Sequence, residues 1–258
     1  MKKFIIFILL VLIGLFCYAR FLEPQNFKIN EYQITSTSLP TSFDGTKIVH
    51  FSDVKYKDDI TMLEKAVTNI NKENPDIVVF TGDLLFNKIS EKEKDNIIKQ
   101  LTNIKSKEYK YAILGDKDGN TARDILTQSN FIILDNSSEY IFKNSETPIL
   151  IAGGTDITDE LLEKDITIDN DFKIALIHKP DDYEAIKDKN ISLVLAGHSL
   201  GGDIIIPFWG NLIKRDGAKT YITPNYKNLY VSYGIGTSKY NMRLFNKPSI
   251  NVYRLNTK

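Results

Sequence analysis

The stretch Leu195-Ala196-Gly197-His198-Ser199-Leu200-Gly201-Gly202-Asp203 joins an apolar run to a histidine that is set among glycines. The apolar run, residues 191–196, is typical of a buried strand, and the glycines after it favour a tight turn with an open backbone. A histidine at such a place is a suitable metal ligand. Taken alone, the stretch is equally consistent with a glycine turn that happens to contain a histidine, so the other strand ends decide between the two.

Four further apolar segments end in residues that can bind a metal. These residues are Asp53, Gly82-Asp83, Gly115-Asp116 and His178. In layered α/β folds ligands bind at the carboxyl ends of strands, so these side chains are expected to converge although they are far apart in sequence. Carboxylates and imidazoles without cysteine suit Mn, Fe or Zn. A single acidic strand end is most often a helix cap, but five such ends with two histidines favour a metal site.

Apolar segments of strand length alternate with segments of helical spacing along most of the chain. Strands are expected at residues 47–52, 76–81, 109–114, 172–177 and 191–196, and helices at 60–72, 90–104 and 181–187. Further short strands are expected at 203–206, 228–233 and 249–255. Alternation of strands and helices followed by a strand-rich ending predicts an α/β layered sandwich with a mixed sheet.

The composition excludes some classes of partner and site. The 258 residues include 33 Lys and Arg and 33 Asp and Glu, so the net charge is zero and no nucleic-acid partner is predicted. The single cysteine, Cys17, lies in the N-terminal apolar segment, so we expect neither a disulfide nor a cysteine-based zinc site in the folded part. This cysteine usage is compatible with either side of a membrane.

An uncharged apolar run follows Met1-Lys2-Lys3 and extends over residues 4–19. As a helix it would be about 24 Å long, and Phe21 and Leu22 lengthen it enough to cross a bilayer. The lysines favour a cytoplasmic N-terminus, and hence a single-pass protein of the cell membrane with an extracytoplasmic C-terminal domain. A cleaved signal peptide is the alternative, but Cys17-Tyr18-Ala19 is a poor cleavage site, so an uncleaved signal anchor is favoured.

The order and spacing of the strand-end motifs over residues 47–255 resemble those of the calcineurin-like metallophosphoesterases, and most closely their small membrane-associated or exported branch. The pattern of that family is Asp-x-His, Gly-Asp, Gly-Asn-His-Asp, a lone His and Gly-His-x-His. The resemblance implies a four-layer αββα sandwich with mixed sheets, two metal ions and hydrolysis of phosphoesters. We therefore expect a signal anchor or transmembrane helix at 1–22, a linker and lead-in strand at 23–46, and a calcineurin-like phosphoesterase domain at 47–258.

This chain departs from the family pattern at three places. The corresponding residues here are Asp53-Val54-Lys55, Gly115-Asp116-Lys117-Asp118 and Gly197-His198-Ser199-Leu200. Carried over residue by residue, the first metal would be bound by Asp53, Lys55, Asp83 and Leu200. An ammonium and an alkyl chain cannot serve as ordinary ligands. The resemblance therefore implies that half of the two-metal site is lost and that Asp53 is a weak ligand.

The second metal would be bound by Asp83, Asp116, His178 and His198, all of which can act as ligands. The resemblance thus implies one divalent metal ion (Mn, Fe or Zn), or none. The general-acid histidine of the family falls at Lys117, which makes a catalytic role of this residue doubtful. We hypothesise that Lys55 and Lys117 supply positive charge near the first-metal position and bind phosphate; the alternative is that both point to solvent.

Three functions are compatible with this sequence. The first is a membrane-anchored domain that binds a phosphorylated small molecule, or a lipid or glycan phosphoester, with little or no hydrolysis of the family type, because losing a general acid alone costs roughly 10²–10⁴-fold in rate. The second is an active phosphoester hydrolase with one metal, bound by Asp83, Asp116, His178 and His198. The third is a structural membrane protein with no metal. Hydrolysis with added Mn, together with metal content, would distinguish them.

Aromatic residues follow the histidine loop. They are Phe208 and Trp209, within Pro207-Phe208-Trp209-Gly210, and Tyr221, Tyr226 and Tyr230. They could form a rim near the site, but large aromatic side chains usually bury much of their area. We therefore expect most of them to lie in the core or in the sheets.

Overall fold

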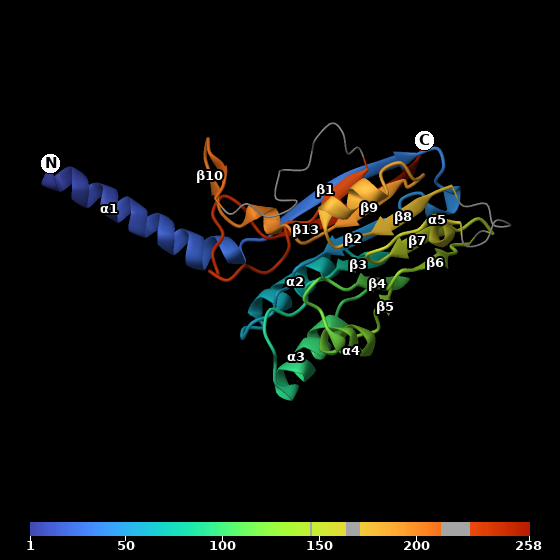
Figure 1. The fold of residues 1–258 in the computed structure, drawn as a ribbon, viewed down its shortest axis with the longest axis horizontal. Helices are drawn as coiled ribbons and strands as arrows, with labels where there is room; N and C mark the ends of the chain where they lie inside the picture. The colour runs from blue at the N-terminus through green and yellow to red at the C-terminus, as the bar shows by residue number, and fades with distance from the viewer. Residues whose placement is uncertain (145, 164–170, 213–227) are drawn as a thin grey trace.

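The computed structural model describes residues 1–144, 146–163, 171–212 and 228–258, and Figure 1 shows their arrangement. One sheet has the order β1 (Lys28–Ser36), β13 (Ser249–Thr257), β2 (Lys47–Phe51), β3 (Ile77–Thr81), β4 (Tyr109–Ile113) and β5 (Ile132–Ile133). The other has the order β12 (Leu229–Val231), β9 (Leu193–Ala196), β8 (Lys173–Leu176), β7 (Ile149–Gly153) and β6 (Ser137–Ile141). Both sheets are mixed, since β13–β2 and β6–β7 pair antiparallel and the other pairs are parallel.

Successive side chains of the buried strands point to opposite faces of their sheet, and this separates the core into layers. In β3, Val78 and Phe80 pack toward helices α2 (Thr61–Lys72), α3 (Glu91–Thr102) and α4 (Asn120–Gln128), whereas Ile77 and Val79 pack between the two sheets. The outer face of the second sheet packs on the short helix α5 (Asp159–Leu162) and the 3-10 helix η4 (Pro180–Ala185). Successive side chains of a strand point to opposite faces, so strands that are apolar throughout can serve both layers. The predicted four-layer αββα sandwich is confirmed.

The predicted elements match the structure closely, with differences at element ends. The helix expected at 181–187 is the 3-10 helix η4, which Pro180 begins. The helix expected at 90–104 is α3, and its capping box of Ser90 and Glu93 is formed. The segment expected as linker and lead-in strand contains β1, which pairs with β13 along its whole length at the edge of the sheet.

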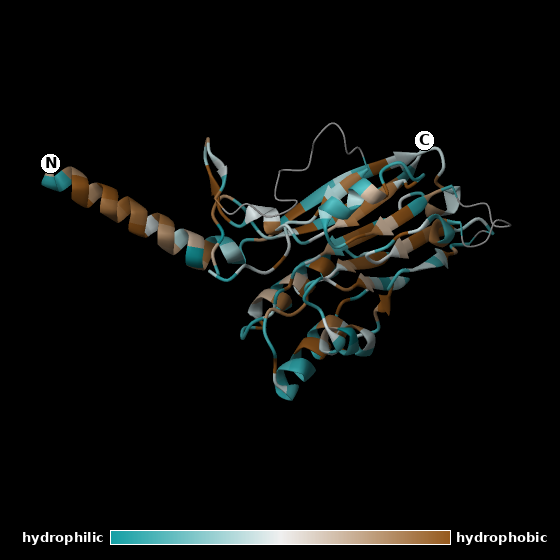
Figure 2. Cartoon of the chain, in the orientation of Figure 1, coloured by the Kyte–Doolittle hydropathy of each residue, from teal (hydrophilic) through white to brown (hydrophobic). Residues whose placement is uncertain are grey.

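The N-terminal helix α1 (Lys2–Cys17) extends away from the domain and is apolar on all sides (Figures 1 and 2). With the two turns that follow it, it forms a candidate membrane span over Lys2–Gln25. The exit of this span, defined here as residues 18–25, is fixed to the domain. Ala19 and Glu23 are buried, the Ala19 carbonyl accepts a hydrogen bond from the Arg243 amide at 3.0 Å, and the Glu23 carboxylate accepts one from the Asn246 amide at 2.6 Å.

The expectation that the aromatic residues after the histidine loop are mostly in the core or sheets is wrong for two of them. Phe208 and Trp209 lie at the tip of a hairpin formed by β10 (Ile205–Ile206) and β11 (Gly210–Asn211), and both are exposed. Tyr230 does lie in β12, against the core between the sheets. Tyr221 and Tyr226 fall outside the described residues. Apolarity predicted burial, but here the apolar residues form the turn of a two-stranded ribbon that packs on neither main sheet.

Candidate metal centre

The carboxyl ends of five strands meet at one edge of the sandwich. Asp53, Asp83 and Asp116 follow β2, β3 and β4 of the first sheet, and His178 and His198 follow β8 and β9 of the second. One ligand atom from each of Asp83, His178 and His198 lies within 4.8 Å of the other two. The predicted convergence of residues from both sheets is therefore found for these three side chains.

Hydrogen bonding orients the two imidazoles. The Nδ1–H of His178 donates to the Thr81 carbonyl at 2.7 Å, so in the neutral ring Nε2 carries the lone pair. That Nε2 lies 3.6 Å from the Oδ1 atom of Asp83 and 3.2 Å from Nδ1 of His198. A backbone carbonyl bonded to the far nitrogen is the usual support of a histidine ligand.

Asp118 fixes the loop that carries Asp83. Its carboxylate accepts hydrogen bonds from the amides of Asp83 at 2.7 Å, Leu84 at 2.9 Å and Gly115 at 2.9 Å. Burial raises the pKa of Asp118 in spite of these donors. A Cβ at Gly115 would lie 2.4 Å from the Asp83 amide, so only glycine allows the loops after β3 and β4 to approach this closely. The sequence contained Asp118 within its motif, but this supporting role was not predicted.

Lys55 is buried between two carboxylates. Its ammonium forms an ion pair with Oδ2 of Asp83 and lies 3.4 Å from Oδ1 of Asp53, and the three side chains are at most 5% exposed. The other oxygen of Asp53 accepts a hydrogen bond from the His198 amide at 2.8 Å. The alternative that Lys55 points to solvent is therefore excluded.

These charges shift the pKa values at the centre. Burial pushes the pKa of Asp83 upward, but the Lys55 ammonium, then His178, outweigh burial and hold it below its ordinary value. Burial, and next the neighbouring His178, lower the pKa of His198, while Asp53 and Asp116 act in the opposite direction. The cluster therefore favours an ionised carboxylate beside a neutral imidazole, which are the forms that bind metals.

Asp116 and Lys117 lie at the rim of the centre. The Oδ2 atom of Asp116 is 3.8 Å from Nδ1 of His198, but it also forms an ion pair with Lys179 at 2.9 Å. The side chain of Lys117 is exposed, and its ammonium lies 5.2 Å from the centre of the Phe86 ring, although its amide donates to Oδ1 of Asp83 at 3.3 Å. The structure thus places Lys55, but not the Lys117 ammonium, between the carboxylates.

Leu200, at the last position of the family's Gly-His-x-His motif, is completely buried. Its carbonyl accepts a hydrogen bond from Arg243 at 3.3 Å. The guanidinium of Arg243 is also buried and donates to the carbonyls of Tyr233, Gly234 and Gly236. Since the Gly236 amide in turn donates to the Asp53 carbonyl at 2.7 Å, Arg243 ties the C-terminal loops to the centre. The sequence patterns did not predict this role of Arg243.

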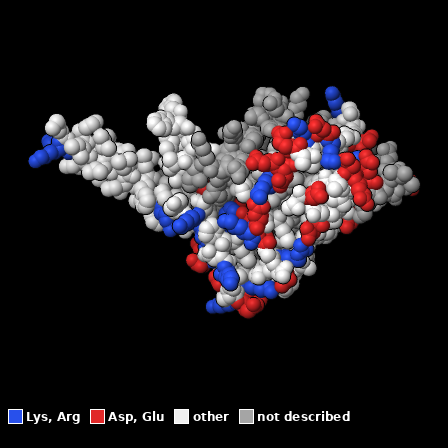
Figure 3. Space-filling view, in the orientation of Figure 1, with Lys and Arg blue, Asp and Glu red and all other residues white. Residues whose placement is uncertain are grey.

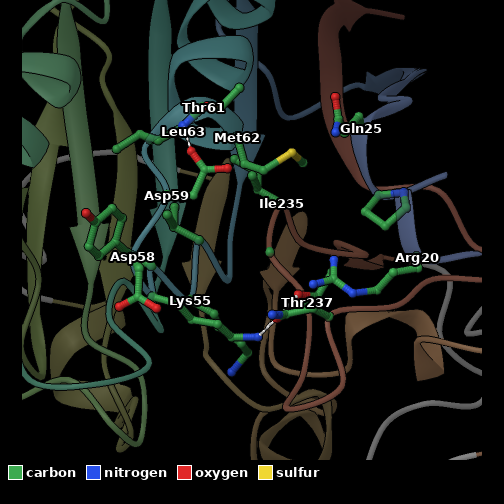
Figure 4. A pocket seen from close by; sticks show the side chains of 16 residues that line it. Arg20, Gln25, Lys55, Asp58, Asp59, Thr61, Met62, Leu63, Ile235 and Thr237 are labelled. Carbon is green, nitrogen blue, oxygen red and sulfur yellow. Dashed lines mark hydrogen bonds between the residues drawn. The ribbon is translucent and has the colours of Figure 1, made fainter. Parts of the chain in front are cut away.

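A pocket of about 250 Å³ lies between Lys55 and the exit of the N-terminal span (Figure 4). Lys55 contributes to its lining as well as to the carboxylate pair. In Figure 4, Arg20 and Gln25 of the exit lie on one side, Asp58 and Asp59 lie on the other, and apolar side chains that include Ile235 lie between them. The pocket therefore offers apolar, cationic and anionic surface beside Lys55.

The side chains present fit one divalent ion. Two imidazole nitrogens and one carboxylate form a donor set that suits Mn, Fe or Zn. Three protein ligands also leave room for a further ligand, as in catalytic rather than structural metal sites. Around Asp53 and Lys55 the donors do not fit a second ion, because the ammonium holds the oxygens that such an ion would need.

Comparison with known proteins gives consistent matches. A family model described as calcineurin-like phosphoesterase matches residues 46–202. An uncharacterized metallophosphoesterase of Bacillus subtilis (strain 168), YkuE, is 32% identical, with 94% of this chain and 90% of that protein covered. A second one from the same organism, YkoQ, is 23% identical, with 96% of this chain and 100% of that protein covered.

A further relative is named as a transmembrane protein. It is a transmembrane protein with metallophosphoesterase domain from Danio rerio, 26% identical over 86% of this chain. The alignment spans 56% of that relative, a little over half of its length.

Proposed function

The chain belongs to the calcineurin-like phosphoesterase family, and on that basis we propose that it is a membrane-anchored member that binds a phosphorylated ligand through a single divalent ion. Families of this kind depend on metal, and Asp83, His178 and His198 form a cluster able to hold one. The proposal further holds that hydrolysis of the family type is weak or lost, since a lysine replaces part of the metal site.

The ion pair of Lys55 with Asp53 and Asp83 is the observation that carries this proposal. A divalent ion at this place would need the same oxygens and would sit next to a buried ammonium. Coulomb repulsion between such charges is large where water is excluded. The ammonium already neutralises much of the buried carboxylate charge, so a second ion would gain little and would have to displace it.

One ion would remain at the other half of the centre. Asp83, His178 and His198 would hold it, with Asp116 as a fourth ligand if its pair with Lys179 opens. When bound, the ion would supply positive charge that attracts and polarises a phosphoryl oxygen. Lys55 would add a fixed positive charge on one side, and Lys179 would do so on the other.

Membrane attachment through the N-terminal span is part of the proposal. The span has the length and apolarity for crossing a bilayer, and one relative is named as a transmembrane protein. Lys2 and Lys3 precede it, so the domain would lie on the extracytoplasmic side. Because the pocket beside Lys55 reaches Arg20 at the exit of this span, its ligand would be bound close to the bilayer.

The pocket favours a ligand with a phosphate and an apolar portion. Met62 supplies apolar surface, backed by the buried Leu63 and Ile235. Arg20 and Lys57 supply positive charge, and Asp58 and Asp59 supply negative charge on the side opposite Arg20. A phosphorylated small molecule, a lipid phosphoester or a glycan phosphoester would satisfy the phosphate-binding part, and the apolar lining fits the lipid best. No nucleic-acid partner is proposed, because the chain has no net positive charge.

An active hydrolase with one metal is the second candidate. The observation that favours it is the three-ligand cluster itself, which leaves a coordination position open beside His198, a side chain that is 23% exposed. In this case Lys55 would stabilise charge on the phosphoryl group during the reaction. The two candidates share one site and differ in turnover.

The test uses the full-length protein in detergent micelles with Mn²⁺. Calorimetry would measure the binding of inorganic phosphate, and a chromogenic nitrophenyl phosphodiester would report hydrolysis. The proposal predicts metal-dependent phosphate binding that His178→Ala abolishes, with hydrolysis at or near background. Hydrolysis that depends on Mn²⁺ and is lost in His198→Ala would instead establish the one-metal hydrolase. If the protein shows no phosphate binding and no hydrolysis, both candidate functions are overturned and a structural membrane protein remains.

A further inference from the structure

The β10–β11 hairpin exposes an uncharged apolar tip. Its strands pair Ile205 with Asn211 and Ile206 with Gly210, and residues 204–212 contain no charged side chain. Phe208 at the tip is fully exposed, and Trp209 is 89% exposed. A single exposed apolar residue is ordinary, but a contiguous exposed apolar patch such as this tip marks an interaction surface.

The turn holds Phe208 in an unfavourable backbone conformation. The Trp209 amide donates to the Ile206 carbonyl at 3.1 Å, and Phe208 has φ of 70° at the third position of the turn. Glycine is the usual residue there, because a side chain at positive φ is strained. A bulky aromatic ring thus stands where the turn chemistry favours glycine, which favours a role for the ring outside the fold.

The base of the hairpin is joined to the exit of the N-terminal span by residues 243–246. On one side, Leu244 exchanges backbone hydrogen bonds with Asp203 and Ile205 at the base of the hairpin. On the other side, the Arg243 amide donates to the Ala19 carbonyl, and the Phe245 amide donates to the Glu23 carboxylate at 2.9 Å. One short segment therefore holds the hairpin next to the point where the span leaves the domain.

The hairpin and α1 project from the same end of the molecule, which is opposite to β6 (Figure 1). In Figure 3 neither shows a charged side chain in this view except at the N-terminal tip of α1. Phe245, in the segment between them, is also exposed. A bilayer crossed by α1 would thus lie against the hairpin tip.

From these contacts we infer that the β10–β11 hairpin is a second membrane contact, with Phe208 and Trp209 inserted into the interface of the bilayer beside α1. The inference rests on the proposed anchoring by α1. Tryptophan is enriched at the membrane–water interface, where its ring is partly apolar and its N–H stays hydrated. Two contacts, unlike one helix, restrict rotation of the domain and keep the pocket at Arg20 and Lys55 facing the lipid headgroups.

Trp209 is the only tryptophan in the chain, so its fluorescence reports this contact directly. The full-length protein would be reconstituted into vesicles of phosphatidylcholine and phosphatidylglycerol, with and without bromine on the acyl chains near the carbonyl. We expect brominated lipid to quench most of the emission and aqueous iodide to quench little of it. The inference would be overturned if iodide quenches the Trp209 emission and brominated lipid does not.

Two sets of variants control this experiment. A chain with Trp209→Phe and Phe142→Trp moves the probe to the exposed residue after β6, at the far end, and should not respond to brominated lipid. Phe208→Asp should reduce quenching of Trp209 by lipid several-fold, whereas Phe208→Leu should largely preserve it. Equal quenching by lipid in Phe208→Asp and Phe208→Leu would argue against insertion of the tip.

Flotation of the same vesicles separates this inference from the anchoring on which it rests. Protein that does not float with the vesicles would overturn the anchoring, and the inference with it. Protein that floats but whose Trp209 is shielded from both iodide and lipid would leave the anchoring intact. It would show that another protein surface, such as a second copy, covers the hairpin instead of lipid, and so would overturn the inference alone.

Discussion

Lys55, Asp53 and Asp83 form a buried group of three charges at the carboxyl ends of β2 and β3. Lys55→Met would leave two carboxylates without their cation, and breaking a buried ion pair in this way costs about 3–5 kcal/mol. We expect a destabilisation of that order in urea unfolding of the full-length protein. We also expect excess Mn²⁺ to restore part of the loss, because a metal ion can then approach the freed oxygens.

Lys117→Met is the matched control, because Lys117, like Lys55, closely follows the end of a strand of the first sheet, but its side chain is exposed. Its removal should change the free energy of unfolding by no more than about 0.5 kcal/mol. A Lys55→Met chain as stable as the Lys117→Met chain, or one indifferent to Mn²⁺, would show that Lys55 does not take the place of a metal.

The burial of His50 predicts that the folded protein loses stability at acid pH. It is completely buried, its Nε2 atom lies 2.8 Å from Oγ1 of Thr81, and burial lowers its pKa to about 3 from 6.5. The unfolded chain takes up a proton below pH 6.5 that the folded chain does not, so stability is full above that pH and is lost as pH falls toward 3. At pH 5 the loss from this residue is about 2 kcal/mol. Urea unfolding at pH 8 and pH 5 measures it, and His50→Asn should show a smaller decrease; an equal decrease in both proteins would refute this origin.

At this scale the sequence predicted which residues would meet but not how each would point. Asp83, His178 and His198 could be predicted because apolar strands place the residues after them at one edge. The directions of Lys55 and Lys117 could not, since both follow strand ends at similar positions. Asp53 and Lys55 have φ of 49° and 44°, a turn that no hydrophobic pattern reveals, and this turn directs the Lys55 ammonium inward.

Among the elements, the exit of the N-terminal span depends on Glu23. Its carboxylate accepts hydrogen bonds from the amides of Phe245 at 2.9 Å and Asn246 at 2.6 Å. Glu23→Ala would leave the Asn246 amide buried without its acceptor, which costs about 1–3 kcal/mol. We expect lower stability to urea, and faster hydrogen exchange at these two amides than elsewhere in the domain.

Glu31→Ala provides the comparison for this change. Glu31 lies in β1 and pairs with Arg254 at the surface, with 48% of its side chain exposed. Surface pairs contribute at most about 1 kcal/mol, so this variant should leave exchange at residues 245 and 246 unchanged. Equal exchange in the Glu23→Ala and Glu31→Ala proteins would argue against docking of the exit through Glu23.

The elements could be predicted where one physical signal dominates. Strands β2, β3, β4, β8 and β9 are short apolar runs, and α3 has its capping box, so their positions followed from the sequence. The strand expected at 203–206 contains β10, but its pairing with β11 into a hairpin was not predicted, because β11 has only two residues, too few for a periodic pattern. Apolar side chains predict removal from water, but they do not distinguish a protein core from a bilayer, which is why Phe208 and Trp209 were assigned to the core or sheets.

Over the whole molecule, the candidate N-terminal span, the C-terminal loops and the candidate metal centre form one connected structure. Arg243 accounts for the connection, because its amide contacts Ala19 while its guanidinium contacts the loops around Asp53 and Leu200. Cleavage after Ala19 would cut through this contact. We therefore expect the membrane-extracted protein to keep its N-terminal segment, measured as intact mass.

The same preparation should stay in the membrane fraction after an alkaline carbonate wash. A chain with Leu9→Arg and Leu10→Arg is the control, since each arginine at the centre of a span costs about 2.5–3.5 kcal/mol of insertion. It should be released by the wash. An intact mass that starts at Arg20, or release of the unaltered protein, would contradict the uncleaved anchor.

The number of metal ions per chain tests the central claim most directly. The full-length protein would be loaded with Mn²⁺, freed of excess ion and analysed for metal by mass spectrometry, beside His178→Ala prepared in the same way. A centre in which Lys55 occupies the first-metal position binds one ion per chain, and His178→Ala binds none. Two ions per chain in the unaltered protein would contradict the account.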